Sequence, residues 1–393
     1  MLSAKSNVDL IYIEGPGDVV EALTRWYKRE DMITETSLTF SGQVFDFCKE
    51  NNLKTLAISA FTEKKCVNFE NFSAYSQPKL MLNGAIGYHL SQVLHGLRIV
   101  ATVIRYRPKY LHITNGTTHW FMLAPLKLFG IKIFPQLHNT FWAKGYPPTG
   151  KIQRILLKLD AWFLKNIASA AICCSPEIVS QIQKITNNQS CPTYVFRAQF
   201  YAHSFDHAAP KQPHEQKPFV VVFSGRVESY KGVFDILEMA EKLRDENVAF
   251  HICGGGSALE ELKNKAELYN LTQYVFIHGR LNRPELHEKY LLGHVVIVPT
   301  RSDFSEGFAM VAAEAILLNR PIITSKIVPA LDILSTASLE AEGNNVDSYV
   351  NAIRQLAFDK TLYERLSAAC RPLHPQFLDR KEGLTKILQN TLV

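Results

Sequence analysis

Residues that could bind an anion follow an apolar run just past the middle of the chain. The segment SGRVESYKG comes directly after PFVVVF and contains Gly225, Arg226 and Lys231. Glycine lets a ligand approach the backbone, an arginine can bind two phosphate oxygens, and a lysine at the start of a helix adds a second positive charge. This combination suits a diphosphate, although a turn with solvated basic side chains has the same composition.

A second segment, GGGSALEEL, follows the apolar run VAFHIC and combines the glycines Gly254 to Gly256 with Ser257 as the expected helix cap. Such a turn could contact a phosphate, but a tight connection between a strand and a helix needs the same residues. The spacing is not the G-x-G-x-x-G of dinucleotide sites, and the next run, YVFIHG, ends without the acidic residue that holds a ribose. We favour a structural turn over a ligand contact.

A third segment, TRSDFSEGFAMVAAEAILL, follows HVVIVP and places Glu306 just before an apolar helix, with Glu314 inside it. The eight residues between them are about 2.2 helical turns, which predicts that both carboxylates lie roughly on the same side. A carboxylate among apolar residues is costly to bury unless it is hydrogen-bonded. Ligand hydroxyls could supply those bonds; alternatively, Glu306 caps the helix and Glu314 pairs with a nearby cation.

Short apolar runs alternate with amphipathic helical segments along the chain, which predicts an α/β protein with parallel sheets covered by helices. The predicted strands are DLIYIE, TLAISA, YLHIT, IKIFPQ and SAAICC in the first half, and PFVVVFSG, VAFHICG, YVFIHG, HVVIVP and PIITS in the second. Because ligands bind at the carboxyl ends of strands in open parallel sheets, the three segments above lie where a site is expected.

The chain is expected to divide into two domains. The polar, proline-containing stretch from His203 to Pro218 has no periodicity and predicts the linker. We therefore expect an N-terminal domain over residues 1–207, a C-terminal domain over residues 208–375, and a last helix within residues 376–393 that packs back toward the N-terminal domain. The segment from Glu14 to Gly42 delays the first helix, which predicts a helical flap over the cleft between the domains.

The composition limits the classes of protein to which the chain can belong. Hydrophobic residues make up 47% and charged residues 20% of the chain, as in ordinary globular proteins. No secretory signal or membrane-spanning run is recognisable, so we expect a cytoplasmic protein. The seven cysteines contain no C-x-x-C spacing, and no D-x-D motif occurs, so neither a zinc cluster nor a metal-bridged diphosphate is expected.

Positive charge is concentrated in the first half of the chain. Between Arg98 and Lys165 there are eleven basic residues and one acidic residue, Asp160. Such a surface attracts anionic partners: membrane lipid, a lipid-linked phosphate or nucleic acid. A charge-rich solvated face without a partner explains the count equally well.

Taken together and in this order, SGRVESYKG, GGGS, IHGRL and VPTRSDFSEGFAMVAAEA with RPIITS resemble the donor domain of the retaining family-four glycosyltransferases. The likeness covers residues 219–358 and implies a GT-B fold, in which two Rossmann-like domains face each other across a cleft. It implies a glycosyltransferase that moves a sugar from a UDP- or GDP-sugar to a glycan or lipid-linked acceptor in polysaccharide or glycoconjugate synthesis.

The resemblance also implies roles for individual residues in binding the donor. Arg226 and Lys231, with Gly225, would bind the donor diphosphate. Glu306 would bind hydroxyls of the transferred sugar, with help from the backbone amides of Gly307 and Phe308. In addition, Glu314 would hold the ribose hydroxyls, and the backbone near Leu281 would contact the base.

In the first half the likeness rests on RPKYLHITNGTTHW and IKIFPQLHNTF, and it implies that His138 faces the donor sugar across the cleft. A single histidine after a strand is otherwise more often structural. Two positions depart from the family pattern, which usually has glycine where Ala309 and Asn319 stand. Asparagine tolerates a left-handed backbone, so the second change is mild. The family's paired glycines after IITS are replaced by KIVPALDIL.

The resemblance implies a metal-independent reaction without a cofactor and with retention of the anomeric configuration. Arg226 and Lys231 would take the place of a metal by stabilising the charge on the leaving nucleoside diphosphate.

Two other classes of protein share some of these sequence features. A nucleotide-binding oxidoreductase would have the same α/β rhythm, and a non-catalytic protein that binds anions or nucleic acid would use the basic half. Because the aromatic residues there form no recognisable RNA or DNA module, we expect no nucleic-acid partner. Peripheral contact with the inner face of the membrane is consistent with the basic stretch.

Overall fold

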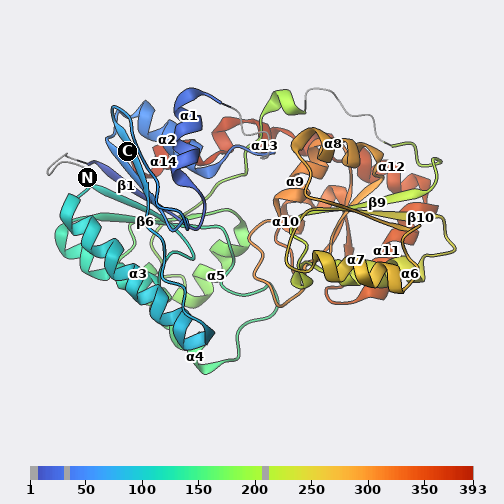
Figure 1. Ribbon diagram of the computed structural model, residues 1–393, viewed down its shortest axis with the longest axis horizontal. Coiled ribbons are helices and arrows are strands. Elements are labelled where there is room, and N and C mark those ends of the chain that lie inside the picture. Colours follow the sequence, from blue (N-terminus) through green and yellow to red (C-terminus); the bar gives the residue numbers. More distant parts are fainter. Residues whose placement is uncertain (1–7, 31–35, 206–211, 393) are drawn as a thin grey trace.

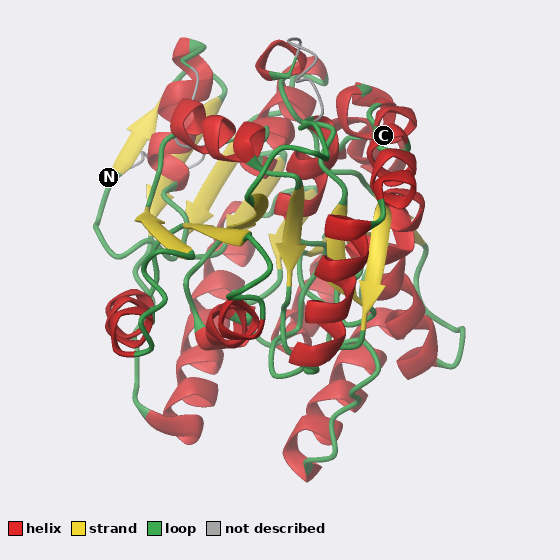
Figure 2. Cartoon of the chain, turned by 90° about the vertical axis from the view of Figure 1, so that its right-hand side faces the viewer, coloured by secondary structure: helices red, strands yellow, loops and turns green. Residues whose placement is uncertain are grey.

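The computed structural model describes residues 8–30, 36–205 and 212–392, which form two α/β halves lying side by side (Figure 1). Helices lie on both sides of the strands in the view of Figure 2. This arrangement confirms the predicted α/β class, and each of the ten predicted strands is present. Because the strands are buried on both faces, they are almost continuously apolar.

The N-terminal sheet has the strand order β3-β4-β2-β1-β5-β6-β7-β8 in the described part of the chain, with β3 antiparallel to β4. Its strands are β1 (Leu10–Glu14), β2 (Thr55–Ser59), β3 (Cys66–Asn68), β4 (Phe72–Ser76), β5 (Tyr110–Thr114), β6 (Lys132–Leu137), β7 (Ala171–Cys173) and β8 (Thr193–Val195). Its helices are α1 (Val19–Lys28), α2 (Phe40–Glu50), α3 (Gly84–Tyr106), the 3-10 helix η1 (Trp120–Phe129), α4 (Lys151–Asn166) and α5 (Pro176–Thr186).

The C-terminal sheet is parallel throughout its described strands, in the order β11-β10-β9-β12-β13-β14. Its strands are β9 (Phe219–Ser224), β10 (Val248–Cys253), β11 (Val275–Gly279), β12 (Val295–Val298), β13 (Ile322–Ser325) and β14 (Ser338–Ala341). Its helices are α6 (Val233–Lys242), α7 (Leu259–Leu268), α8 (Arg283–Leu292), α9 (Met310–Leu317), α10 (Ala330–Leu334), α11 (Val346–Phe358) and α12 (Lys360–Ala368).

Each sheet has one point at which the direction of strand addition reverses. In the N-terminal sheet this switch lies between β1 and β5, and in the C-terminal sheet it lies between β9 and β12. At a switch point the loops after two neighbouring strands turn to opposite faces and leave a crevice between them. The loops after β1, β5, β9 and β12 are therefore the positions at which this fold can hold a ligand.

The end of the chain returns to the N-terminal half after α13 (Pro375–Leu378), and α14 (Leu384–Leu392) packs against α2. Gln43 on α2 fixes this return. Its side-chain oxygen accepts from the backbone N–H of Leu384 at 2.9 Å, and its carbonyl accepts from the Thr385 hydroxyl at 2.9 Å. Figure 1 shows the C-terminus beside the N-terminal sheet, far from the sheet that precedes it in sequence.

The segment from Glu14 to Gly42 does lie at the space between the halves, as predicted, because residues 14–18, 21, 22 and 37–41 line a cavity there. Val19, Val20 and Leu23 of α1 are buried, so this helix packs on its own sheet as an ordinary covering helix. A short segment after the undescribed residues 31–35 does reach the other half, because the hydroxyl of Thr36 donates to Glu314 at 2.5 Å.

Helix α9 begins and ends at residues with a left-handed backbone. Ala309, directly before the helix, has φ 72°, and Asn319, just after it, has φ 57°. These are the positions where the sequence replaces the glycines of the family pattern. Asparagine accepts this conformation readily, whereas an alanine Cβ is strained there by about 1–2 kcal/mol.

We therefore predict that Ala309→Gly stabilises the fold, by about 0.5–1 kcal/mol. The relief of backbone strain exceeds the extra freedom that glycine gains in the unfolded chain, about 0.4–1 kcal/mol. Urea unfolding measures the change. Ala313→Gly, inside α9 and fully buried, is the matched control and is expected to destabilise the fold by about 1 kcal/mol. Destabilisation by Ala309→Gly would contradict the prediction.

Candidate functional site

A cavity of about 610 Å³ lies between the two halves, at the carboxyl ends of the central strands of the N-terminal sheet. The N-terminal half contributes Glu14 at the end of β1, Asn115 after β5 and His138 after β6. The C-terminal half contributes residues of the loop between β12 and α9, namely Glu306, Phe308, Ala309 and Met310. The cavity therefore opens at the N-terminal switch point and is closed by the loop that leaves the C-terminal one.

The two loops that form this cavity are joined by hydrogen bonds from side chains of one loop to backbone carbonyls of the other. The Asn139 side chain donates to the carbonyl of Ser305 at 2.8 Å, and the Thr140 hydroxyl donates to the carbonyl of Glu306 at 3.1 Å. A Cβ on Gly307 would lie 1.7 Å from the His138 carbonyl oxygen, so no side chain fits at this position. Glycine at 307 thus allows the two halves to approach backbone to backbone, and His138 and Glu306 line the same cavity.

Two of the residues predicted to bind the donor form a partly buried ion pair. Lys231, in the loop after β9, donates through Nζ to a carboxylate oxygen of Glu306, and the Thr300 hydroxyl lies 3.3 Å from the same oxygen. The side chains of Lys231 and Glu306 are 15% and 11% exposed. A partly shielded pair is screened less than a surface pair, so each charge depends on its partner.

Arg226 lies at the rim of this site, beside two aromatic rings. Tyr230 and Phe304 stack with their centroids 4.6 Å apart, and the Arg226 guanidinium carbon lies 5.6 and 5.5 Å from their centroids. The Nζ of Lys231 lies 4.4 Å from the Phe304 centroid. Both cations thus contact Phe304, and Arg226 contacts Tyr230 as well.

The glycine-rich turn serves the packing of two loops. A Cβ on Gly254 would lie 1.7 Å from the carbonyl oxygen of Gly225, and one on Gly256 would lie 2.2 Å from that of Val227. The turn after β10 thus packs closely against the turn after β9, a structural reason for these glycines that the sequence did not indicate. Ser257 does not cap α7 as we expected, because its backbone N–H and hydroxyl both donate to the Glu228 carboxylate, at 2.9 and 2.6 Å.

Glu314 lies apart from Glu306. It is on α9 and 7% exposed, and its carboxylate accepts from the hydroxyl of Thr36 at 2.5 Å and from that of Tyr290 at 2.8 Å. Burial and the neighbouring carboxylate raise the pKa of Tyr290 well above its ordinary value. Glu306 lies in the loop before α9 and Glu314 inside the helix, as predicted, but only Glu306 lines the cavity.

The remaining predicted site residues lie in two places. Gly225 has φ 146° and begins the loop that carries Arg226. Phe308 lines the cavity, and Gly307 lies against the carbonyl of His138. Leu281 lies half-buried between β11 and α8 and is not part of the cavity lining. The structure therefore brings together Lys231, Glu306 and His138, with Arg226 nearby, and leaves Leu281 and Glu314 outside this cavity.

Sequence reasoning missed Glu14, which ends the first predicted strand. Its Oε2 is buried without a hydrogen-bond partner among the described residues, and its side chain lines the cavity. Burial, with a contribution from Asp18, raises the pKa of Glu14 to about 7. The available signal was its position: an acidic residue at the carboxyl end of the strand beside a switch point.

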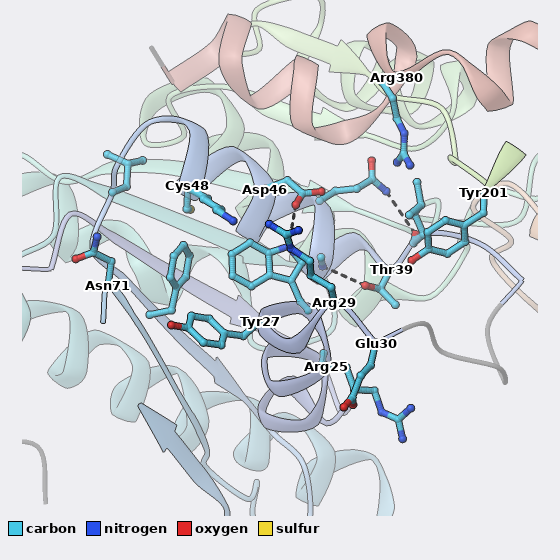
Figure 3. A pocket seen from close by; sticks show the side chains of 18 of the residues that line it. Arg25, Tyr27, Arg29, Glu30, Thr39, Asp46, Cys48, Asn71, Tyr201 and Arg380 are labelled. Atoms are coloured by element: carbon cyan, nitrogen blue, oxygen red, sulfur yellow. Dashed lines mark hydrogen bonds between the residues drawn. The ribbon is translucent and has the colours of Figure 1, made fainter. Parts of the chain in front are cut away.

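A second cavity, of about 920 Å³, lies in the N-terminal half and shares Ala22 and residues 37–39 with the first. Figure 3 shows Arg25, Arg29 and Asp46 from the α1 and α2 region and Tyr201 and Arg380 from later in the chain around it. Aromatic rings and charged groups of both signs thus line a space that adjoins the central cavity.

The comparisons with known proteins agree with this geometry. Residues 204–371 match the family model of the glycosyl transferases group 1. Poly(ribitol-phosphate) alpha-N-acetylglucosaminyltransferase of Staphylococcus aureus (strain COL) is 31% identical over 123 residues. That match covers 31% of this chain and 24% of the relative.

Two solved structures resemble the whole chain. Sucrose-phosphate synthase from Thermosynechococcus elongatus has a TM-score of 0.72 at 15% identity, with 98% of each chain covered. HepE of Anabaena, solved in complex with UDP, has a TM-score of 0.66 at 13% identity, with 98% of this chain and 99% of HepE covered. At these identities the likeness is one of fold. Residues 204–371 thus resemble the glycosyl transferases group 1, and the whole chain has the GT-B fold.

Proposed function

We propose that this protein transfers a sugar from a nucleotide-sugar donor to a glycan or lipid-linked acceptor in polysaccharide or glycoconjugate synthesis. The observation that carries the proposal is the pairing of Lys231 with Glu306 at a cavity whose opposite wall holds His138. Both walls are loops at the carboxyl ends of parallel strands. The family match supports a transferase and disfavours the oxidoreductase alternative.

In this proposal the donor diphosphate replaces Glu306 as the partner of Lys231. Arg226 lies beside the same aromatic rings, so the two cations stabilise the negative charge that develops on the leaving nucleoside diphosphate. Once Lys231 binds phosphate, the Glu306 carboxylate is available to accept hydrogen bonds from the hydroxyls of the sugar. The ion pair thus keeps two buried charges compensated until the donor arrives.

For the donor we propose a UDP-sugar, with UDP-N-acetylglucosamine and UDP-glucose as the first compounds to test. The relative in Staphylococcus aureus is an N-acetylglucosaminyltransferase, and HepE was solved with UDP. Glu314 remains our candidate for the ribose. Its carboxylate accepts from the hydroxyls of Thr36 and Tyr290, and in this proposal ribose hydroxyls take their place.

Retention of the anomeric configuration is part of the proposal. The acceptor oxygen then attacks from the face that the phosphate leaves. The acceptor proton passes to a donor phosphate oxygen, and the electron pair of the broken bond stays on the nucleoside diphosphate. Arg226 and Lys231 stabilise that charge throughout.

The second cavity is our candidate path for the acceptor. It adjoins the central cavity through residues 37–39 and combines Trp26 and Tyr27 with Arg29, Asp46 and other charged side chains. A sugar ring has apolar faces and a polar rim of hydroxyls, which such a mixed lining can bind.

We also propose peripheral contact with an anionic membrane through α3, η1 and α4. Helices α3 and α4 both pack against η1, and all three carry exposed apolar side chains: Ile86 and Leu97 on α3, Leu128 on η1, and Ile152, Ile155 and Trp162 on α4. Exposed basic residues lie on the same elements, including Lys151, Arg154 and Lys158 on α4. Apolar and basic groups on these neighbouring elements favour the interface of an anionic bilayer.

No helix in the described ranges meets the length and hydropathy of a membrane span. We propose that the protein works in the cytoplasm, at the inner face of the membrane.

Substitutions of Lys231 and Glu306 test the main proposal. Lys231→Met and Glu306→Gln are each expected to lower transfer or hydrolysis of the UDP-sugar at least 100-fold, about 2.7–4 kcal/mol. Lys231→Met leaves a buried carboxylate without its cation and should also destabilise the fold. The double variant should regain that stability but no activity.

Lys326→Met and Glu340→Gln are the matched controls, because they form an exposed ion pair at 3.1 Å in the same half. Both controls should keep normal turnover. Near-normal turnover in either site variant would refute the role of that residue, and a wild-type protein inert toward every UDP- and GDP-sugar would refute the proposal itself.

Removal of metal ions tests the proposal that Arg226 and Lys231 stabilise the leaving group without a metal. We expect turnover to survive excess EDTA, because Arg226 and Lys231 supply the positive charge at the leaving group. The measurement compares rates before and after dialysis against EDTA. Complete inhibition that Mg²⁺ or Mn²⁺ reverses would show that a cation takes part in the reaction.

Liposome flotation tests the membrane contact. At low salt the protein should float with anionic vesicles and not with neutral ones, and high salt should release it, since each basic residue near the surface adds about 1 kcal/mol. Lys151→Glu/Lys158→Glu should abolish flotation, whereas Lys263→Glu/Lys326→Glu in the other half should not. Failure of the wild-type protein to bind anionic vesicles at low salt would indicate a soluble acceptor.

A further inference from the structure

Behind the N-terminal wall of the cavity, three polar side chains form a continuous row. His112 lies on β5 and Gln136 on the neighbouring strand β6, and both are fully buried. His138 follows two residues after Gln136, on the same face of the sheet, and lines the cavity. Two histidines joined by a buried amide have no role in packing an apolar core, which suggests that the row serves the cavity.

The hydrogen bonds along this row fix where the imidazole protons lie. His112 Nε2 lies 2.5 Å from Gln136 Oε1, and since an amide oxygen only accepts, His112 Nε2 carries a hydrogen. Gln136 Nε2 lies 2.9 Å from His138 Nε2, and since an amide nitrogen only donates, His138 Nε2 accepts. The hydrogen of a neutral His138 is therefore on Nδ1.

The surroundings of both rings favour neutral imidazoles. The His112 ring stacks on Tyr12 at 5.5 Å, and the His138 ring lies 4.5 Å from Phe40 and 6.2 Å from Phe196. Burial lowers the pKa of each histidine to about 4. The other titratable groups that line the cavity are Tyr12, Glu14, Asp18, Glu21, Cys174 and Glu306.

We propose that Gln136, supported by His112, is a positioning residue that holds His138 as a neutral Nδ1–H tautomer, so that the ring donates a hydrogen bond into the cavity. The backbone N–H of His138 donates to Asn115 Oδ1 at 2.9 Å, which anchors the residue from its other side. With Nε2 bound to Gln136, Nδ1 is the ring nitrogen left for a ligand.

This inference rests on the proposed function and makes it more specific. A fixed Nδ1–H binds a hydroxyl oxygen of the transferred sugar as a donor, and it takes no proton during the reaction. His138 then acts by orientation, complementary to Glu306, which accepts hydrogen bonds from the other wall. Turnover of this enzyme should therefore show no titration of an imidazole between pH 5.5 and 8, the range in which an unperturbed histidine changes charge.

The test reads the tautomer directly, in the free full-length protein. Long-range ¹H–¹⁵N correlation spectra of ¹⁵N-histidine-labelled protein, with His138→Gln to assign the signal, should show a neutral Nδ1–H ring from pH 8 down to pH 5.5. A ring protonated at Nε2, or one that titrates near its ordinary pKa, would overturn the inference without any activity measurement.

Gln136→Glu supplies the second readout. A carboxylate only accepts, so it should move the His138 hydrogen to Nε2 and raise the pKa of that ring toward or above its ordinary value. The turnover number should fall about 10- to 100-fold, as for other supporting partners of a site residue, while the affinity for UDP stays within about twofold. Gln136→Met removes the amide that donates to His138 Nε2, so the His138 ring should no longer be fixed in the Nδ1–H tautomer.

His119→Gln is a matched control, because His119 pairs with His89 at 3.2 Å on another part of the same half and should leave both readouts unchanged. An altered tautomer with unaltered turnover would overturn the proposed role of His138. If the tautomer is as expected but no nucleotide-sugar reacts, the proposed function fails while the assignment of the protons stands.

Discussion

The contact between the loop after β6 and the loop after β12 is the constraint on which the rest of the site depends. Gly307 lies against the carbonyl of His138, and two side chains of the first loop bond to backbone carbonyls of the second. Any side chain at 307 would push the halves apart. Both loops leave strands next to the switch points, so a contact of a few atoms fixes how two independent sheets share one cavity.

Much of this arrangement could be predicted from the sequence, because buried parallel strands are continuous apolar runs. All ten predicted strands are present, and Lys231 and Glu306 meet even though 75 residues separate them. The strands β3, β4, β8 and β14 were not predicted. β3, β8 and β14 are edge strands of three or four residues, and β4, with the sequence FSAYS, is not a continuous apolar run. Pattern alone gives such strands no clear signal.

What could not be predicted depends on contacts between distant segments. One partner of Glu314 is Thr36, which is 278 residues away, and no local spacing indicates it. The need for Gly254 arises from the carbonyl of Gly225, and the orientation of His138 arises from Gln136 and His112 on adjacent strands. In each case the sequence shows the residue type, but the contact that explains it is made with a residue that only the fold brings close.

The path of the chain has a mechanical consequence. It passes from the N-terminal sheet to the C-terminal one after β8, and it returns before α14, which Gln43 fastens to α2. The line through these two covalent crossings is the natural axis for a rotation that would open the cavity, whereas full separation of the halves would require α14 to detach from α2. Such a hinge releases the contacts farthest from the axis first and leaves the tethered edge closed.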